Sequence, residues 1–434
     1  MKKSISVLAV VAVLLLSVPV NGSTEEYSLE DLYRIALARS EKLKVAEENL
    51  SISEIGQEKA LSYLLPRMTA TSSLTQYSEK RYNSAGSLIQ PESASSWGVR
   101  LDETLSTNGR ELTALEISRQ GITKSQYDLR AVREDYLLRY VAAAYYNVLM
   151  ARKNLDIADS NLDRLQKYRE ATEKRLRIGE VTRTVLLRAE GELSGAKSDR
   201  LQALNALDLA TAVLASNVGI KGTFSLRETP MAETELQAVD RFKEQAFAAR
   251  ADLKSLEVLK QIAAGQIKYA EGAFWPTLSL SGVYSGSDQS PGTSSLNRES
   301  LYGGVALNFP FFEGGLRKAE LSEAKARERQ AALQYEDYKK GIDIEVQSAY
   351  LDLATQKGIL QFLSDQLAFA RDNYNAVARQ FEFGLSTSLD VLDANTLLVS
   401  AERKAASALY SYRLAHLKMK KATGTLLAAE ESKP

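Results

Sequence analysis

The sequence repeats one series of motifs twice, at a spacing of about 205 residues. IALARSEKL at 35–43 matches QAFAARADL at 245–253. GVRLDETLSTNGRELTALE, from Gly98, matches GVALNFPFFEGGLRKAELS, from Gly304, and RLRIGEVTRTVLLRAE later matches QFEFGLSTSLDVLDAN. Because the matches keep one order, we expect the chain to fold as two equivalent halves rather than as unrelated domains.

Each copy predicts the same order of elements, which makes the fold class mixed α+β with mostly long α-helices. A helix comes first in each copy, at 28–62 and 240–272, and Pro66 and Pro276 end it because proline disfavours a helical residue before it. Two strands, a long helix and a returning helix follow. The strands are expected at about 66–77, 97–106, 276–286 and 301–311, the long helices at about 110–176 and 316–381, and the returning helices at 183–218 and 388–422.

The predicted lengths fit together. At 1.5 Å per residue each long helix would measure about 100 Å, and each shorter helix about half of that. Two short helices stacked end to end would therefore match one long helix and pack along it as a coiled coil. A single globular core does not need helices of this length.

The first residues predict an export signal. Met1-Lys2-Lys3 is a short basic start, the run from Ile5 to Leu16 is apolar, and small residues precede Ser23. Residues 1–22 are therefore expected to be a secretory signal peptide. We expect no membrane-spanning helix in the mature protein, so any entry into a membrane would be as β-structure.

The remaining chain is expected to divide into the two copies and two short pieces. These are a first repeat 23–222, a linker 223–239, a second repeat 240–423 and a C-terminal tail 424–434. The sequence has no cysteine, which excludes disulfides and a lipid-modified N-terminal cysteine and fits the bacterial envelope. The formal net charge is zero, so no basic surface for nucleic acid is expected.

The four predicted strands have the length and weak alternation of transmembrane β-strands. Val305, Leu307 and Phe309 alternate with small or polar residues, and the loops between strands are rich in Ser, Pro, Asn and Gly. Four strands cannot close a barrel, and an open edge in lipid would expose unpaired backbone groups. The chain is therefore expected to oligomerise in the membrane.

The sequence contains no recognisable catalytic, metal or cofactor motif, so we expect no enzyme activity, no metal site and no cofactor. His416 is the only histidine, and we interpret it as an ordinary helix residue. Nucleophile-elbow, dinucleotide and P-loop patterns are missing from the sequence. A hydrolase would have to rest on isolated carboxylates, none of which the sequence singles out.

LNFPFFEGGLRKAE, at the second strand-to-helix junction, and FEFGLSTSLDVLDANTLLVSAE, at the second tip, resemble the TolC-type outer-membrane efflux proteins. The resemblance covers nearly the whole mature chain, and the first copy keeps the pattern more loosely. It implies a homotrimer with a twelve-stranded β-barrel across the outer membrane lipid, continued by an α-helical barrel through the periplasm. It also implies a periplasmic adaptor protein and an inner-membrane transporter as partners, in an efflux or type I secretion system.

Given this resemblance, we expect the glycines after the strands of this chain to mark the passage from membrane to water. Gly314 and Gly315 follow the fourth predicted strand, and Gly109 follows the second. Glycine tolerates the backbone angles and the crowding expected at such a bend. We therefore assign these three glycines to the strand-to-helix junctions.

Asp390 and Asp393 are the candidate aperture residues. They are three residues apart, hence on one face of the returning helix, and in a trimer each would form a ring of carboxylates that favours cations. The simpler interpretation is that Asp390 completes a capping box with Thr387 and that both acids suit the positive end of the helix. The two interpretations are compatible. Arg188 takes the place of Asp393 in the first copy and is expected to reach an acid on a neighbouring helix.

The repeated G-x-x-T turns are the candidate adaptor contacts. Gly179 with Thr182, and Gly384 with Thr387, form these turns. They could be plain helix-to-helix turns, and the resemblance adds contact with adaptor hairpins. Phe381 stands where the family often has tyrosine.

A secreted or periplasmic coiled-coil protein, structural or adhesive and without a pore, is the alternative to an export duct. It would explain the helices equally well. It does not explain the predicted strands.

Overall fold

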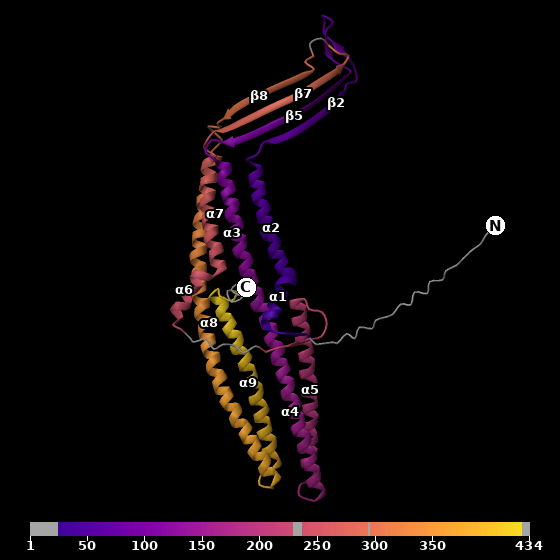
Figure 1. The fold of residues 1–434 in the computed structure, drawn as a ribbon, viewed down its shortest axis with the longest axis vertical. Coiled ribbons are helices and arrows are strands. Elements are labelled where there is room, and N and C mark those ends of the chain that lie inside the picture. Colours follow the sequence, from indigo (N-terminus) through magenta and orange to yellow (C-terminus); the bar gives the residue numbers. More distant parts are fainter. Residues whose placement is uncertain (1–24, 229–236, 294–295, 428–434) are drawn as a thin grey trace, which may run out of the picture.

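The computed structural model describes residues 25–228, 237–293 and 296–427, so the predicted signal peptide 1–22 lies outside the described residues. The molecule is elongated, with a sheet at one end and two helical tips at the other (Figure 1). The first half contains β1 Glu25–Tyr27, α1 Leu29–Arg39, α2 Glu41–Ser62, β2 Arg67–Gln76, β3 Arg81–Tyr82, β4 Leu88–Gln90, β5 Ser93–Ser106, α3 Arg110–Tyr136, a π-helical turn Leu137–Ala142, α4 Ala143–Arg177 and α5 Arg183–Val218. The second half contains β6 Phe224–Leu226, α6 Val239–Ala249, α7 Ala251–Gly272, β7 Thr277–Ser290, β8 Glu299–Asn308, α8 Leu316–Glu382 and α9 Ser388–Ala422.

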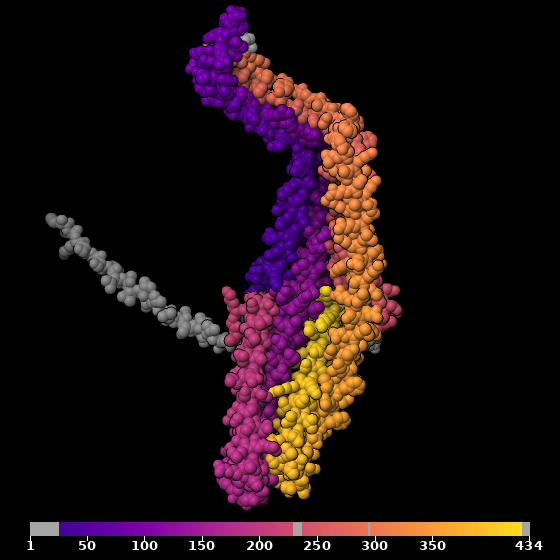
Figure 2. Space-filling view, turned by 180° about the vertical axis from the view of Figure 1, so that it is seen from behind, coloured from indigo at the N-terminus to yellow at the C-terminus, as the bar shows by residue number. Residues whose placement is uncertain are grey.

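The helices form a row in which short helices lie end to end along long ones. Near the sheet, α2 packs on α3, α3 on α7 and α7 on α8. Toward the tips, α5 packs on α4, α4 on α9 and α9 on α8. Figure 2 shows the same layout from behind, with α9 running beside α8. We call the level at which α2 gives way to α5, and α7 to α9, the equatorial level.

The first helix of each copy is broken, which corrects the predicted continuous helices 28–62 and 240–272. Ser40 separates α1 from α2 and Arg250 separates α6 from α7, each with an extended ψ of 124°. Neither residue is a helix breaker by propensity. The break instead follows from packing, because the backbone of Arg250 lies close against Gly424 at the end of α9.

The sheet has the order β2-β5-β7-β8, and all three pairs are antiparallel. β5 begins four residues before the predicted start and β7 runs four residues past the predicted end, because the two strands stay paired from Ser106 with Thr277 out to Ser93 with Ser290. β8 ends at Asn308, so 309–311 lie outside the strand that was predicted to include them. The reason is Pro310, which cannot donate a hydrogen bond to the ladder.

The connecting pieces are more ordered than predicted. The polar loop between β2 and β5 contains a small ribbon, β3 with β4. β1 pairs in parallel with β6, so the predicted linker 223–239 begins with a strand. Leu426 and Leu427 are buried in the main core, so the predicted tail 424–434 starts with packed residues.

The main core lies at the equatorial level. Most of its members come from α1, the π-helical turn, α4, α5 and α9, and they include the fully buried Leu32, Leu137, Val141 and Leu214. Within the described residues, none of the helices is both long and apolar enough to cross a membrane. The sheet and the tips extend away from this core in opposite directions (Figure 1).

Candidate functional site

The tips are two equivalent helix-to-helix turns. Gly179 follows the end of α4 with φ 82°, and Gly384 follows the end of α8 with φ 72°. In each turn the glycine N–H donates to a carbonyl of the preceding helix, Leu176 or Phe381, at 3.1 and 3.0 Å. These left-handed positions favour glycine, because a side chain would be strained there.

Thr182 and Thr387, which precede the returning helices α5 and α9, form different side-chain hydrogen bonds. Thr387 and Asp390 form a complete capping box, with Asp390 Oδ2 accepting from the Thr387 N–H at 2.8 Å and from its hydroxyl at 2.7 Å. These hydrogen bonds hold the pKa of the Asp390 carboxyl below its usual range. The Thr182 hydroxyl instead bonds Thr184 at 2.6 Å, because Val185 stands where a capping acid would be needed. The predicted capping box of Thr387 and Asp390 is thus confirmed.

Within the described ranges, no hydrogen bond or ion pair joins the three candidate aperture residues. Asp390 and Asp393 are exposed on the first turns of α9, and Arg188 is exposed on α5. Arg188 lines a groove of about 830 Å³ between the two tips, together with Thr182, Gly384 and Thr387. Among the described residues Arg188 forms no ion pair, so its acidic partner remains a prediction for a neighbouring chain.

The side chain of Arg175, which the sequence analysis did not single out, links the two tips. Arg175, near the end of α4, donates to the carbonyl oxygens of Phe381 and Glu382 at the end of α8. Its guanidinium also lies 4.3 Å from the centre of the Phe381 ring. The Tyr168 ring lies tilted against the Phe381 ring, with 5.6 Å between the ring centres, and its hydroxyl hydrogen-bonds Ser388. The contacts of Arg175 and Tyr168 are with the ring of Phe381, so they do not need the hydroxyl of a tyrosine at this position.

A second polar layer lies farther from the tips, between α4 and α9. Arg164 donates to Asn395 at 2.9 Å and to Glu402 at 3.4 Å, and Asn395 donates to Asn161 at 2.7 Å. Asn161 and Asn395 are buried, which makes each amide dependent on its partner. The sequence signal was weak, because these residues look like ordinary polar positions of a coiled coil.

The junction glycines have positive φ, at 73° for Gly109, 60° for Gly314 and 90° for Gly315. A Cβ on Gly314 or Gly315 would meet nothing within 4 Å, so the expected crowding is wrong and the backbone angle alone explains them. Gly109 and Gly315 are the first flanking residues of α3 and α8. Glycine is therefore needed at these bends for its backbone dihedral angles, and not because neighbouring atoms leave no room for a side chain.

The register gives the sheet two chemically different faces. Residues directly opposite each other share a face, which confirms the predicted alternation of β5. One face carries mostly large apolar side chains, with the carboxylate of Glu103 among them, namely Met68, Leu74, Trp97, Val99, Leu101, Leu105, Leu278, Leu280, Tyr284, Leu301, Val305 and Leu307. The other face carries hydroxyls, namely Thr69, Thr71, Ser73, Thr75, Ser96, Thr104, Ser279, Ser281, Ser285, Ser287 and Ser300, and the ion pair Arg100 with Asp102.

A family model described as "Outer membrane efflux protein" matches residues 32–219 and 243–425, which is most of both repeats. The chain belongs to the outer membrane efflux protein family. It is similar to the outer membrane efflux protein BepC of Brucella suis, with 25% identity over 76% of this chain and 72% of the relative. It is also 25% identical to the outer membrane protein TolC of Salmonella enteritidis, over 92% of this chain and 82% of that protein.

Solved structures have the same fold. A structure of CusC has a TM-score of 0.79 at 21% identity, covering 92% of this chain and 93% of that one. The open-state structure of the Neisseria gonorrhoeae MtrE outer membrane channel has a TM-score of 0.74 at 24% identity, covering 92% and 89%. The protein is thus an outer-membrane efflux protein with a TolC-like fold, mostly helical with a four-stranded sheet at one end, from a family of channels rather than enzymes.

Proposed function

We propose that three copies of this chain form the exit duct of a tripartite efflux or type I secretion system. The sheets would close a twelve-stranded barrel in the outer membrane, and the helices would continue it through the periplasm. An inner-membrane transporter would supply the energy and a periplasmic adaptor would hold the duct in place. The chain itself would act as a passive conduit.

The two-faced sheet with two open edges carries this proposal. Within one chain β2 and β8 each pair on one side only, and both edges run for ten residues. Unpaired backbone groups in lipid cost several kcal/mol each, so the β8 edge of one copy needs the β2 edge of the next. The apolar face would then meet lipid and the hydroxyl face would line a water-filled interior.

The ends of the helix row support the same closure. α8 exposes Ile344, Leu351, Phe362 and Phe369 along its length, each more than half exposed. At the other end of the row, α2 exposes Val45 and Ile52, and α5 exposes Leu187, Leu201 and Leu209. Large exposed apolar stripes of this kind mark contact surfaces. Joining α8 of one copy to α2 and α5 of the next would cover both.

The tips would form the aperture. The Arg175 contact with α8 and the Arg164 layer hold the two hairpins of a chain together, so their release would widen the opening. Asp390 and Asp393 would form two rings of carboxylates in the trimer, and Arg188 would reach an acid of the adjacent chain. Rings of this sign favour the passage of cations.

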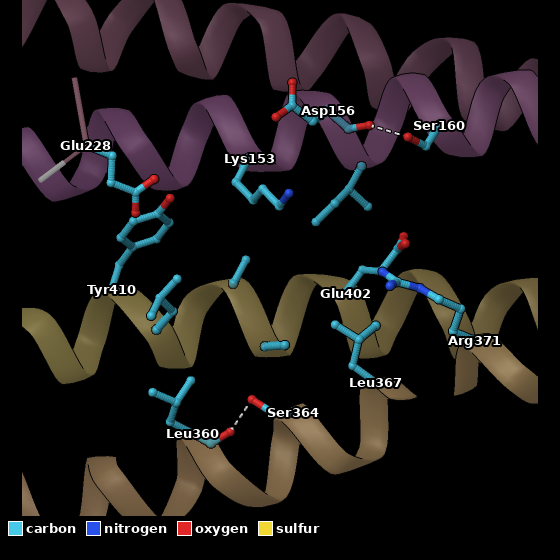
Figure 3. A pocket seen from close by; sticks show the side chains of 14 residues that line it. Lys153, Asp156, Ser160, Glu228, Leu360, Ser364, Leu367, Arg371, Glu402 and Tyr410 are labelled. Carbon is cyan, nitrogen blue, oxygen red and sulfur yellow. Dashed lines mark hydrogen bonds between the residues drawn. The ribbon is translucent and has the colours of Figure 1, made fainter. Parts of the chain in front are cut away.

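The adaptor would bind the tip turns and the groove above them. Gly179, Thr182, Gly384 and Thr387 lie at the exposed turns. A groove of about 640 Å³ runs along α9 between α4 and α8, with small side chains such as Ala405 and Ala406 in its lining (Figure 3). Charged groups from Lys153, Asp156, Glu402 and Arg371 stand around it (Figure 3). Such a groove suits an amphipathic helix with polar edges.

Single-channel conductance in a planar bilayer tests the duct and the aperture together. The detergent-purified wild type is compared with Asp390→Ala/Asp393→Ala. We expect cation-selective pores whose selectivity falls in the double variant. Unchanged selectivity would refute the acidic rings but keep the duct, and folded protein that forms no pores would refute the duct itself. The variant Glu192→Ala, on α5, removes one carboxylate per chain outside the proposed rings and is the control.

A further inference from the structure

The two repeats pair their own strands in the same register. Arg67 faces Asp102 in the first copy, and Thr277 faces Asn308 in the second. Thr277 lies 210 positions after Arg67, and Asn308 lies 206 positions after Asp102. The prolines before β2 and β7 are also 210 positions apart, and the Gly-Val pairs within β5 and β8 are 206 apart. Each strand of the sheet therefore has a residue-by-residue equivalent in the other repeat.

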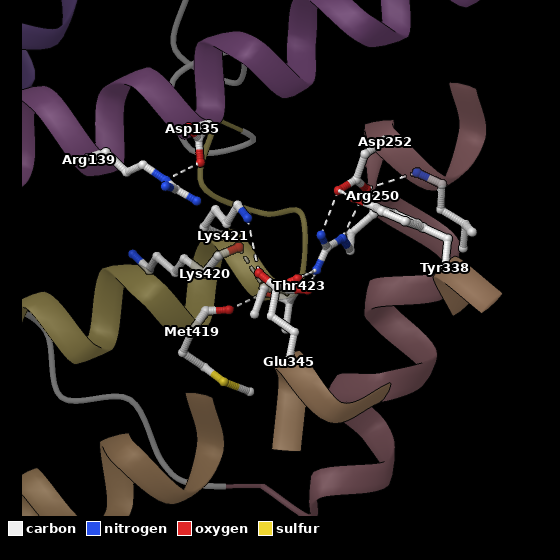
Figure 4. Close-up of polar contacts among 12 residues, drawn as sticks. Asp135, Arg139, Arg250, Asp252, Tyr338, Glu345, Met419, Lys420, Lys421 and Thr423 are labelled. Carbon is white, nitrogen blue, oxygen red and sulfur yellow. Dashed lines mark hydrogen bonds and ion pairs between the residues drawn. The ribbon is translucent and has the colours of Figure 1, made fainter. Parts of the chain in front are cut away.

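The repeats share this backbone pattern but not their side-chain contacts. Arg250 takes the place of Ser40, 210 positions earlier, and its side chain is only 3% exposed. It donates to Asp252 at 3.0 and 2.6 Å, to Glu345 on α8 at 2.6 Å, and to the Ala422 carbonyl at 3.3 Å (Figure 4). A serine cannot form such ion pairs. The equivalence of the repeats therefore extends to strand register and sheet face, and not to individual side-chain contacts.

The strands of the sheet are staggered by a constant step. Asp102 of β5 faces Arg67 of β2 on one side and Ser281 of β7 on the other. Ser281 is the equivalent of Thr71, so this row of the sheet moves by four residues from β2 to β7. Ser281 in turn faces Gly304, and the step from β5 to β8 is again four residues. Closing a barrel requires a fixed stagger between strands, and equal steps give every strand the same tilt.

We propose that β8 of one copy pairs with β2 of the next copy in the register in which Gly304 faces Thr75. We call this line of contact between two copies the seam. Thr75 is the equivalent of Ser285, which lies four residues beyond Ser281, so the register continues the four-residue step across the seam. The proposal rests on the trimeric barrel of the proposed function and adds the residue pairs that meet at each seam.

This register matches the two faces of the sheet across the seam. On the apolar face Val305 faces Leu74, and Leu307 faces Ser72. Leu74 and Val305 are 77% and 72% exposed in the single chain, so each covers the other. A shift by one residue would bring the apolar face of one copy against the hydroxyl face of the next. A shift by two residues would keep the faces together but would change the strand tilt at the seams alone.

The same register gives partners to the aromatic residues that follow β8. Phe311 faces Met68 of the next copy, and Phe309 faces Ala70. In the single chain Phe311 is 90% exposed and Met68 is 71% exposed. Pro310 lies between the two phenylalanines and has no N–H, so the backbone ladder cannot continue through it. Side-chain contacts therefore extend the seam beyond the end of the ladder.

The backbone ladder of the seam is short. Within the bounds of the two strands it runs from Gly303 facing Gln76 to Asn308 facing Thr71. This is less than half the length of the ladder between β5 and β7 inside each chain. The barrel would therefore alternate between long ladders within chains and short ladders between them.

The lack of cysteine allows a direct test of the seam by disulfide cross-linking. Two introduced thiols can react only with each other or with those of another copy, because the sequence has no other cysteine. Within one chain β5 and β7 lie between β2 and β8, which separates residues 74 and 305 by three strand spacings, roughly 14 Å. A disulfide needs Cα atoms within about 7 Å of each other. Any bond between these two positions must therefore join two copies.

The experiment compares double-cysteine variants of the full-length protein in detergent, oxidised with copper phenanthroline and run on non-reducing gels. Leu74→Cys/Val305→Cys is expected to give a covalent trimer. Leu74→Cys/Gly303→Cys and Leu74→Cys/Leu307→Cys are the matched controls. Each places the second thiol diagonally, at about 7–8 Å, and should cross-link severalfold less. Ser72→Cys/Leu307→Cys lies in the proposed register and repeats the test at a second position.

The outcomes separate the register from the duct. Stronger cross-linking of either control, or equal cross-linking of all pairs, would overturn the proposed register and leave the trimeric barrel in place. If none of these pairs joins two copies in protein that is folded by circular dichroism, the contact between β8 and β2 is refuted. Single-channel conductance of the same preparations then shows whether a pore forms without that contact.

Discussion

The guanidinium of Arg175 on α4 donates a hydrogen bond of 3.0 Å to the backbone carbonyl oxygen of Glu382, the last residue of α8. The two residues are 207 positions apart and belong to different repeats. Their contact is therefore a link between the two hairpins at the tip. The Arg175 side chain is only 17% exposed, so water replaces its bonds poorly.

Arg175→Ala should weaken the link between the two tip hairpins. A hydrogen bond from a charged group contributes about 1.5–3 kcal/mol, and the variant also loses the stacking on Phe381. We expect a higher open probability in single-channel records, with the sheet intact. Arg177→Ala is the matched control, because Arg177 is 70% exposed and, among the residues that the structure describes, pairs with Glu173 of its own helix. Equal records for the two variants would contradict the link.

The local features of the tips could be predicted from sequence, and the long-range ones could not. The Gly384 turn and the Thr387 capping box depend on residues within a few positions, so spacing alone predicts them. The partners of Arg175 and Arg164 lie more than 200 residues away and depend on how the repeats pack. The sequence identifies such residues only as polar positions on a helix.

The same distinction holds for the helix breaks and the π-helical turn. Ser40 and Arg250 interrupt their helices without proline or glycine, because the ends of α5 and α9 pack against these positions. The π-helical turn Leu137–Ala142 likewise contains neither proline nor glycine, so the sequence does not mark it. Propensity arguments do not contain this information.

Alanine substitutions at two glycines of α8, one just before its start and one in its middle, should change the free energy of unfolding in opposite directions. Gly315→Ala places a side chain at φ 90°, and we expect a loss of about 1–2 kcal/mol in the free energy of unfolding. Gly341→Ala lies within α8, where a Cβ would meet nothing within 4 Å, and should gain about 1 kcal/mol from helix propensity. Thermal midpoints of the two variants, each compared with wild type, check this. Shifts of the same sign would contradict the assignment of Gly315 to a strained junction.

Trp97 and Gly286 make a tight cross-strand contact on the apolar face of the sheet. A Cβ on Gly286 would lie 2.6 Å from the indole ring, so Gly286→Ala must displace Trp97. We expect a shift in tryptophan emission and a loss of about 1–3 kcal/mol from overpacking. Gly282→Ala, on the same strand and face with open space, should leave the emission unchanged. The emission of a Trp275→Phe background isolates Trp97, because the chain has two tryptophans.

His416, the only histidine, should make the stability of the helical body depend on pH. Burial, with a smaller contribution from the Lys420 ammonium, lowers the pKa of His416 to about 4, whereas an unfolded chain has about 6.5. Between these values the unfolded chain binds a proton that the folded chain does not. Stability that is present above pH 6.5 is therefore lost as the pH falls toward 4, by on the order of 3 kcal/mol in total. Thermal midpoints at pH 7.5 and 5.0 should differ less in His416→Gln than in wild type, and identical differences would show that His416 titrates normally in the fold.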